Sequence, residues 1–259
     1  MKERQFRGER KPQEPIPENL AVGRNALREL LSGEKDIEKI YVAKGDRDGS
    51  LVRLLQTARD RHIPVISIEK ADLDKMAGGI PHHGVVCTVP AEQYSTVADM
   101  LALAEERGEK PLIVICDGVE DPHNLGAIIR SAECAGAHGV IIPKRRACGL
   151  TGVVSKSSAG ALAYMPVARV TNLVSTIEEL KDKGLWIYAA DMDGTPYAES
   201  NLTGAMALVL GSEGSGISRL VKENCDFVLS IPLWGKVNSL NVSNACAVLL
   251  CEAARQRHL

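Results

Sequence analysis

Three segments in the C-terminal half of the chain combine polar side chains and glycines in patterns that could support chemistry. The first is DGVEDPHNLGAIIRSA (117–132), which contains Asn124 and Arg130. A guanidinium keeps its proton, so a partly buried Arg130 would require a carboxylate or phosphate partner. Two plainer interpretations stay open: Asn124 caps the following helix, and Arg130 forms a surface pair with Glu133.

The second segment, ALVLGSEGSGIS (207–218), is an apolar strand that runs into a glycine-rich turn and then a helix. Gly211 lets the backbone approach a ligand closely, and the helix start offers free N–H groups. The segment lacks the Lys-Ser/Thr ending of a P-loop and the spacing of a dinucleotide fingerprint. Glu213 would repel a pyrophosphate, so the turn favours a cationic or hydroxyl-bearing ligand unless Glu213 is an ordinary exposed charge.

The third segment, 231–257, begins with IPLWGKVNSLNVSNA and continues as a long apolar helix. We expect a strand that ends at Pro232, followed by a loop with Gly235. Four polar residues precede the helix: Ser239, Asn241, Ser243 and Asn244. One of them is enough to cap it, so the segment forms either a polar site at a strand end or a loop rich in capping residues.

Composition narrows the class of protein. The 259 residues are 45% hydrophobic and 25% charged, which is typical of a folded chain with about two domains. No apolar run approaches the roughly 18 residues that a spanning helix needs, and the first residues lack a signal peptide, so we expect a cytoplasmic protein without membrane contact. The seven cysteines and six histidines are scattered without metal-ligand spacing, so we expect neither disulfides nor a metal.

The alternation of predicted elements divides the chain. Residues 1–17 are a charged tail without apolar period, 18–90 a small α/β domain, 91–108 a linker helix and 109–259 a second domain. Strands that alternate with helices in the second domain predict a mostly parallel sheet covered on both faces. Ligands of such sheets lie at the carboxyl ends of strands, which is where the three polar segments begin.

The three segments, in this order and at these separations, resemble motifs one, two and three of the SpoU/TrmH family of RNA ribose methyltransferases, within the SPOUT group. VGRNALRELL and HHGVV resemble the two ends of that family's N-terminal domain. The resemblance implies methyl transfer from S-adenosylmethionine to a ribose 2′-hydroxyl. It also implies a ribosomal-protein-like RNA-binding domain in front, a C-terminal trefoil knot that forms the cofactor site, and a homodimer through the knotted domain.

The family's active-site positions fall on Asn124, Arg130, Glu213 and Asn241. By the same resemblance Arg130 would hold a substrate phosphate and favour the alkoxide, oriented by Asn124 and Glu213, while Asn241 would position substrate or cofactor. The positions expected to contact the cofactor are Leu210, Gly211, Ile231, Leu233, Ser239 and Leu240. The candidate RNA contacts are the tail, Arg24, Asn25, Lys144, Arg145 and Arg146, with a solvated charged face as the alternative for the last three.

Several functions remain to be separated. Within the family the closest resemblance is to the two-domain branch that methylates a guanosine of 23S ribosomal RNA, and a transfer-RNA ribose methyltransferase is the alternative. A non-catalytic RNA-binding protein of the same fold is a second class, against which the four intact active-site positions argue. A nicotinamide dehydrogenase would need its glycine motif in the first βα unit and an acidic residue at the next strand's end, whereas Asp226 precedes its strand.

Overall fold

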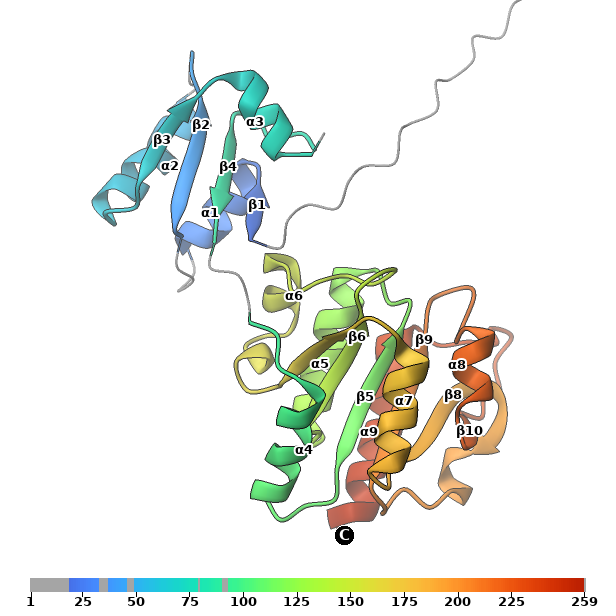
Figure 1. Ribbon diagram of the computed structural model, residues 1–259. Helices are drawn as coiled ribbons and strands as arrows, with labels where there is room; N and C mark the ends of the chain where they lie inside the picture. The colour runs from blue at the N-terminus through green and yellow to red at the C-terminus, as the bar shows by residue number, and fades with distance from the viewer. Residues whose placement is uncertain (1–18, 33–36, 46–48, 79, 90–92, 259) are drawn as a thin grey trace, which may run out of the picture. The chain divides into compact units, whose positions relative to one another are not determined.

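The computed structural model describes residues 19–32, 37–45, 49–78, 80–89 and 93–258. The chain divides into two compact units, 1–92 and 93–259. Both units are drawn in Figure 1. No helix among the described residues is both long and apolar enough to cross a membrane. The predicted tail, 1–17, lies outside the described residues.

The first unit is a four-stranded sheet with helices on both faces. Its elements are β1 (Leu20–Val22), α1 (Arg24–Ser32), β2 (Lys39–Ala43), α2 (Gly49–Asp60), β3 (Val65–Ile68), α3 (Lys70–Met76) and β4 (Val85–Thr88). The strand order is β1-β4-β2-β3, and only the β2–β3 pair is parallel. Leu27 of α1 and Leu55 of α2 are buried in one apolar cluster, while Leu73 of α3 belongs to another. This small α/β unit matches its prediction, except that β1 was not foreseen.

The second unit is built on a parallel sheet of six strands. Its strands are β5 (Leu112–Asp117), β6 (Gly139–Pro143), β7 (Val167–Val170), β8 (Trp186–Pro196), β9 (Met206–Gly211) and β10 (Phe227–Ser230). Its α-helices are α4 (Val97–Glu106), α5 (Pro122–Cys134), α6 (Gly152–Ser157), α7 (Leu173–Asp182), α8 (Arg219–Glu223) and α9 (Val242–His258). The order is β10-β8-β9-β5-β6-β7, and every neighbouring pair is parallel, which confirms the predicted sheet.

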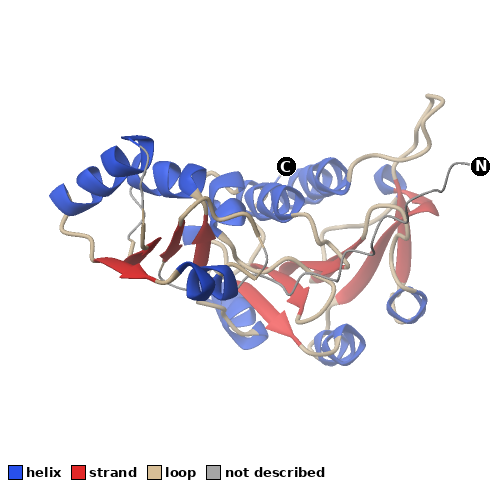
Figure 2. Cartoon of the chain, turned by 90° about the horizontal axis from the view of Figure 1, so that it is seen from above, coloured by secondary structure: helices blue, strands red, loops and turns tan. Residues whose placement is uncertain are grey.

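Helices cover both faces of this sheet. Apolar residues of α4, α7 and α8 pack on one face and those of α5, α6 and α9 on the other, with the strands as a layer between helices in Figure 2. All six residues of β5 are buried, as expected for a strand enclosed on both sides. The helix predicted as a linker, α4, packs onto β6: a Cβ added at Gly139 would lie 2.2 Å from the Met100 sulfur.

One strand boundary was predicted wrongly. The strand expected to reach Pro232 ends at Ser230. Pro232 has no N–H to donate to a neighbouring strand, and no described residue forms a hydrogen bond with the backbone of residues 231–240. This open loop leads directly into α9.

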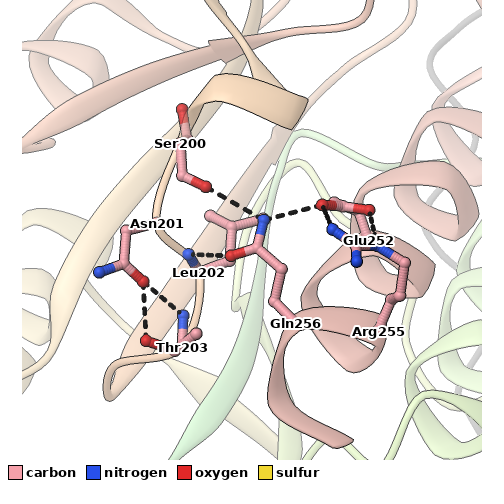
Figure 3. A network of polar contacts seen from close by, with 7 residues as sticks. All are labelled: Ser200, Asn201, Leu202, Thr203, Glu252, Arg255 and Gln256. Carbon is pink, nitrogen blue, oxygen red and sulfur yellow. Dashed lines mark hydrogen bonds and ion pairs between the residues drawn. The ribbon is translucent and has the colours of Figure 1, made fainter. Parts of the chain in front are cut away.

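The last turns of α9 are tied to the loops at the amino ends of β5 and β9. Gln256 accepts a hydrogen bond from the Leu202 N–H (2.8 Å) and donates to the Ser200 carbonyl (3.1 Å), as Figure 3 shows. The Arg257 guanidinium donates to four carbonyls, those of Lys110 (2.8 Å), Pro111 (3.2 Å), Leu202 (3.1 Å) and Gly204. The C-terminal helix is therefore fastened at its end as well as along its apolar face.

We expect Arg257→Met to lower the free energy of unfolding by about 2 kcal/mol, because the apolar stem is kept while four hydrogen bonds to a charged donor are lost. Urea unfolding followed by circular dichroism measures the change. Arg255→Met is the matched control, since Arg255 lies in the same turn and pairs with the Glu252 carboxylate. Equal effects of the two substitutions would contradict the proposed fastening.

The pH dependence of stability is expected to include a contribution from His138. This residue is 1% exposed, accepts the Leu112 N–H on Nδ1 (3.0 Å) and lies 3.0 Å from Glu109 through Nε2. Burial lowers its pKa below the ordinary 6.5, although Glu109 acts in the opposite direction. The unfolded chain then binds more protons than the folded chain as pH falls through 6.5, so stability is lost on the acid side. Urea titrations between about pH 8 and 5 should show a shallower decline for His138→Gln than for the wild type.

Candidate active site

The carboxyl ends of β5 and β9 form the edge at which a ligand is expected. The two strands are paired neighbours, with Asp117 opposite Gly211 in the register. The strand order reverses between them, since β6 and β7 extend the sheet on one side of β5 while β9, β8 and β10 extend it on the other. Ligands of open parallel sheets bind at such a reversal. A cavity of about 870 Å³ lies here, and the loops after both strands line it.

Asp117, which lines the cavity, links β5 to the start of α8. Its side chain is almost fully buried, and Oδ2 accepts the Ser218 N–H at 2.7 Å. Ser218 is the residue before α8, so the end of β5 is bonded to the start of the helix that follows β9. The glycine-rich turn between β9 and α8 is therefore held at both ends by β5, because β9 pairs with β5 and Ser218 is bonded to Asp117.

The turn itself is a tight backbone hairpin. Ser212 and Gly216 exchange N–H to carbonyl hydrogen bonds, each 3.0 Å long. A Cβ added at Gly211 would lie 2.2 Å from the Gly216 carbonyl carbon and 2.3 Å from the Ile217 nitrogen. Only glycine therefore fits at this position, and the hairpin presents Glu213 near its tip.

Three of the four predicted catalytic residues meet in one hydrogen-bonded cluster. Asn124 Nδ2 donates to Glu213 Oε1 at 3.0 Å, and Asn241 Nδ2 donates to the same oxygen at 2.6 Å. Asn241 Nδ2 also lies 2.9 Å from Asn124 Oδ1. We call Asn124, Glu213 and Asn241 the amide–carboxylate cluster. It joins α5, the helix that follows β5, to the loops that follow β9 and β10.

The capping interpretation of Asn124 is wrong. Asp121 is the N-cap of α5, and its carboxylate accepts the His123 N–H at 2.8 Å, with Pro122 in the first turn. Asn124 lies inside the helix, so its amide is free to reach Glu213. Asn241 has both roles, because its Oδ1 accepts the Ser243 N–H at 2.9 Å near the start of α9 while Nδ2 serves the cluster.

Arg130 lies outside the amide–carboxylate cluster. It lies six positions after Asn124 on α5, so the two side chains point about 120° apart and their Cα atoms differ by about 9 Å along the axis. Arg130 is exposed and forms no ion pair or hydrogen bond with any described residue, Glu133 included. The described part of the chain thus leaves the guanidinium available to another molecule.

The six positions expected to contact the cofactor lie at the end of β9 and in the 231–240 loop that follows β10. Leu210 is buried at the end of β9 and Gly211 follows it, while Ile231 is half-buried. Leu233, Ser239 and Leu240 are exposed in the 231–240 loop. This loop combines unengaged backbone groups with apolar side chains, and such a set fits an adenosyl group held through the backbone.

The candidate RNA contacts separate into different surroundings. Arg146 has a φ of 55° and lines the cavity, whereas Lys144 and Arg145 are exposed beside it. In the first unit Arg24 Nε donates to the His83 carbonyl at 2.8 Å, and Asn25 accepts a hydrogen bond from Arg28 at 3.2 Å. Arg24 therefore has a structural contact in addition to any role with RNA.

An ion pair at the same cavity was missed. Lys222 Nζ lies 2.7 Å from Asp191 Oδ2, and both residues line the cavity. The hydrogen bond from Lys222 lowers the pKa of Asp191 from its ordinary value. Asp191 lies within β8 directly after an apolar run, and a carboxylate at that position was the available signal.

Together these features define an α/β protein with a polar ligand site at the switch point of a parallel sheet. Residues 111–251 match the family model described as the SpoU rRNA Methylase family, and residues 20–95 match that of RNA 2′-O ribose methyltransferase substrate binding. The chain belongs to the SpoU rRNA methylase family.

Similar proteins cover nearly the whole chain. YacO of Bacillus subtilis, assigned to the TrmH family of tRNA/rRNA methyltransferases, is 44% identical over 93% of this chain and 96% of its own length. A solved structure of the SpoU methyltransferase AviRb from Streptomyces viridochromogenes, in complex with the cofactor AdoMet, is 25% identical with a TM-score of 0.61 and covers 92% of this chain and 90% of its own. The solved structure of the TrmH/SpoU tRNA modifying enzyme of A. aeolicus is 30% identical with a TM-score of 0.52 and covers 61% of this chain and 82% of its own.

Proposed function

We propose that this protein transfers a methyl group from S-adenosylmethionine to the ribose 2′-hydroxyl of a specific guanosine in 23S ribosomal RNA. The observation that carries the proposal is the meeting of Asn124, Glu213 and Asn241 at the switch point of the sheet. Ribosomal RNA is favoured over transfer RNA because the family model that matches residues 111–251 is described as that of an rRNA methylase family, while the tRNA modifying enzyme covers only 61% of this chain.

S-adenosylmethionine would supply an electrophilic methyl group when bound. Gly211 and the backbone of the 231–240 loop would hold it, with Leu210, Ile231, Leu233, Ser239 and Leu240 around it. Transfer to a hydroxyl requires alignment and loss of a proton from a weak acid. The two amides fix the Glu213 carboxylate, so its negative charge stands in one place beside the cavity. Arg130, always charged and exposed, would neutralise a substrate phosphate and the developing alkoxide.

The homodimer and the trefoil knot implied by the resemblance remain proposals. Arg130 faces away from the amide–carboxylate cluster of its own chain, so we infer that it acts on the substrate at a shared site between two second units. Mixing Arg130→Ala with Asn241→Ala chains tests this. A shared site should recover part of the activity that each variant lacks alone, whereas no recovery, with mixed dimers shown to form, would contradict it.

Labelled methyl transfer to purified 23S and transfer RNA tests the proposed function, with the product mapped as a bond resistant to alkaline hydrolysis. We expect label at one ribose of 23S RNA with the wild type and none with Arg130→Ala. Label in transfer RNA alone would contradict the proposed substrate and identify transfer RNA as the substrate instead. No label on any RNA despite cofactor binding would contradict the proposed enzyme activity and favour a non-catalytic RNA-binding protein.

A further inference from the structure

A second cavity lies in the first unit. It measures about 410 Å³ and is lined by residues of α3 and of the turn before β4. The lining residues that matter are Lys70, Asp74, Ile80, Pro81, His82 and His83. We call it the α3 pocket.

His82 is the fixed wall of the α3 pocket. It is 7% exposed, its Nδ1 accepts the Gly84 N–H at 3.0 Å, and its Nε2 lies 2.7 Å from Asp74 Oδ1. Because Nδ1 accepts, the neutral ring carries its proton on Nε2 and donates it to Asp74. Both nitrogens of His82 are thus engaged, so this histidine shapes the pocket and is not available to a ligand.

The neighbouring residue His83 differs from His82 because its imidazole is exposed and not engaged by any described residue. His83 has a φ of 47° and Gly84 a φ of 84°, so two successive residues lie in the left-handed region. A non-glycine residue there costs free energy and requires support from its surroundings. Arg24 supplies support by donating to the His83 carbonyl at 2.8 Å. The turn leaves the His83 imidazole exposed at the pocket and without a hydrogen-bond partner among the described residues.

The remaining lining supplies charge and apolar surface. The exposed Lys70 ammonium pairs with no described residue, not even with Asp74 one helical turn on. Ile80 and Pro81 form an apolar wall, and Asp74 Oδ2 can still accept a hydrogen bond beyond the bond that Oδ1 makes with His82. These groups match the parts of one nucleotide. The cation matches the phosphate, the flat ring and the apolar wall match the base face, and the spare acceptor matches the N–H edge of the base.

We propose that the α3 pocket binds an unpaired nucleotide of the RNA substrate, with the base against His83 and Pro81 and a phosphate at Lys70. The proposal rests on the proposed function, because it assigns a contact to the unit that matches RNA substrate binding. Recognition of a splayed base would let this unit select single-stranded segments over duplex.

Binding of the full chain to a fluorescein-labelled, mixed-sequence 12-nucleotide RNA, alone and as a duplex, tests the pocket by anisotropy at several salt concentrations. His83→Gly removes the ring and relieves the left-handed strain, so it should raise the Kd for the single strand about tenfold without loss of stability. Lys70→Gln should flatten the dependence of log Kd on log salt by about 0.7, as expected for one lost phosphate contact. His83→Phe should keep wild-type affinity because it keeps a stacking ring.

Lys75→Gln is the matched control, since Lys75 is on the same helix, outside the pocket lining, 3.6 Å from Asp72. It should leave the single-strand Kd unchanged.

The ring signal of His83 in the ¹³C-histidine spectrum of the full chain, assigned through His83→Gly, should shift on addition of the 12-nucleotide RNA. An unmoved signal at saturation, or equal effects of Lys70→Gln and Lys75→Gln, overturns the pocket. Measuring methyl transfer with the same preparations separates failure of the pocket from failure of the proposed function. Transfer by the wild type together with an outcome that overturns the pocket refutes the pocket alone. Absence of transfer to any RNA refutes the proposed function alone.

Discussion

Glu213→Gln is expected to lower kcat for methyl transfer about 100-fold while leaving the fold intact. The amide oxygen of the replacement can still accept hydrogen bonds from Asn124 and Asn241, so the amide–carboxylate cluster is kept. The negative charge beside the cavity is lost. If that charge organises the cationic groups of the transition state, the rate falls and RNA affinity does not.

Glu213→Ala separates charge from structure. It removes the acceptor as well, which leaves the buried Asn124 amide without this partner and should lower stability by about 1–3 kcal/mol. Glu120→Gln is the control, because Glu120 is an exposed carboxylate lining the same cavity and forms no ion pair with any residue described. Wild-type kcat in Glu213→Gln, measured with saturating RNA and cofactor, would show that the charge has no catalytic role.

Gly211→Ala is expected to abolish transfer and to lower the free energy of unfolding by about 3 kcal/mol. The added methyl group would meet the backbone of Gly216 and Ile217 at 2.2–2.3 Å, where no flexible side chain can move aside. The hairpin must open, and opening displaces Glu213 from both asparagines. Loss of cofactor binding should accompany the loss of activity, because Gly211 is also a proposed cofactor contact.

Gly152→Ala is the matched control for this substitution. Gly152 begins α6, has no atom within 4 Å of an added Cβ and has no positive φ, so alanine there should be neutral or slightly stabilising. Calorimetric cofactor titration and urea unfolding on both variants give the comparison. A folded Gly211→Ala protein with wild-type cofactor affinity would mean that the turn relaxes without consequence.

Most elements of the fold were predictable because each depends on a local pattern. β5 is a continuous apolar run, and the long helices have apolar faces that repeat at helical spacing. β1 was missed because three residues carry too little periodicity, and the strand exists through its pairing with β4, more than sixty positions on. The predicted end of β10 was wrong because the segment IPL is apolar enough to continue the strand. The pairing of β10 with its neighbour β8 nevertheless ends at Ser230.

The amino-acid sequence by itself determined the chemistry available and its approximate location: polar residues after the ends of three apolar strands, and glycines in the turn. Only the tertiary structure decided how these residues are used. Asp121 caps α5 in place of Asn124, three positions on, and composition cannot decide between the two residues. The single Glu213 oxygen that accepts from residues 89 and 28 positions away depends on β5, β9 and β10 ending at one edge. Hydrogen bonds over such separations are set by the order of strands in the sheet, and that order is a property of the packed core and not of any local segment.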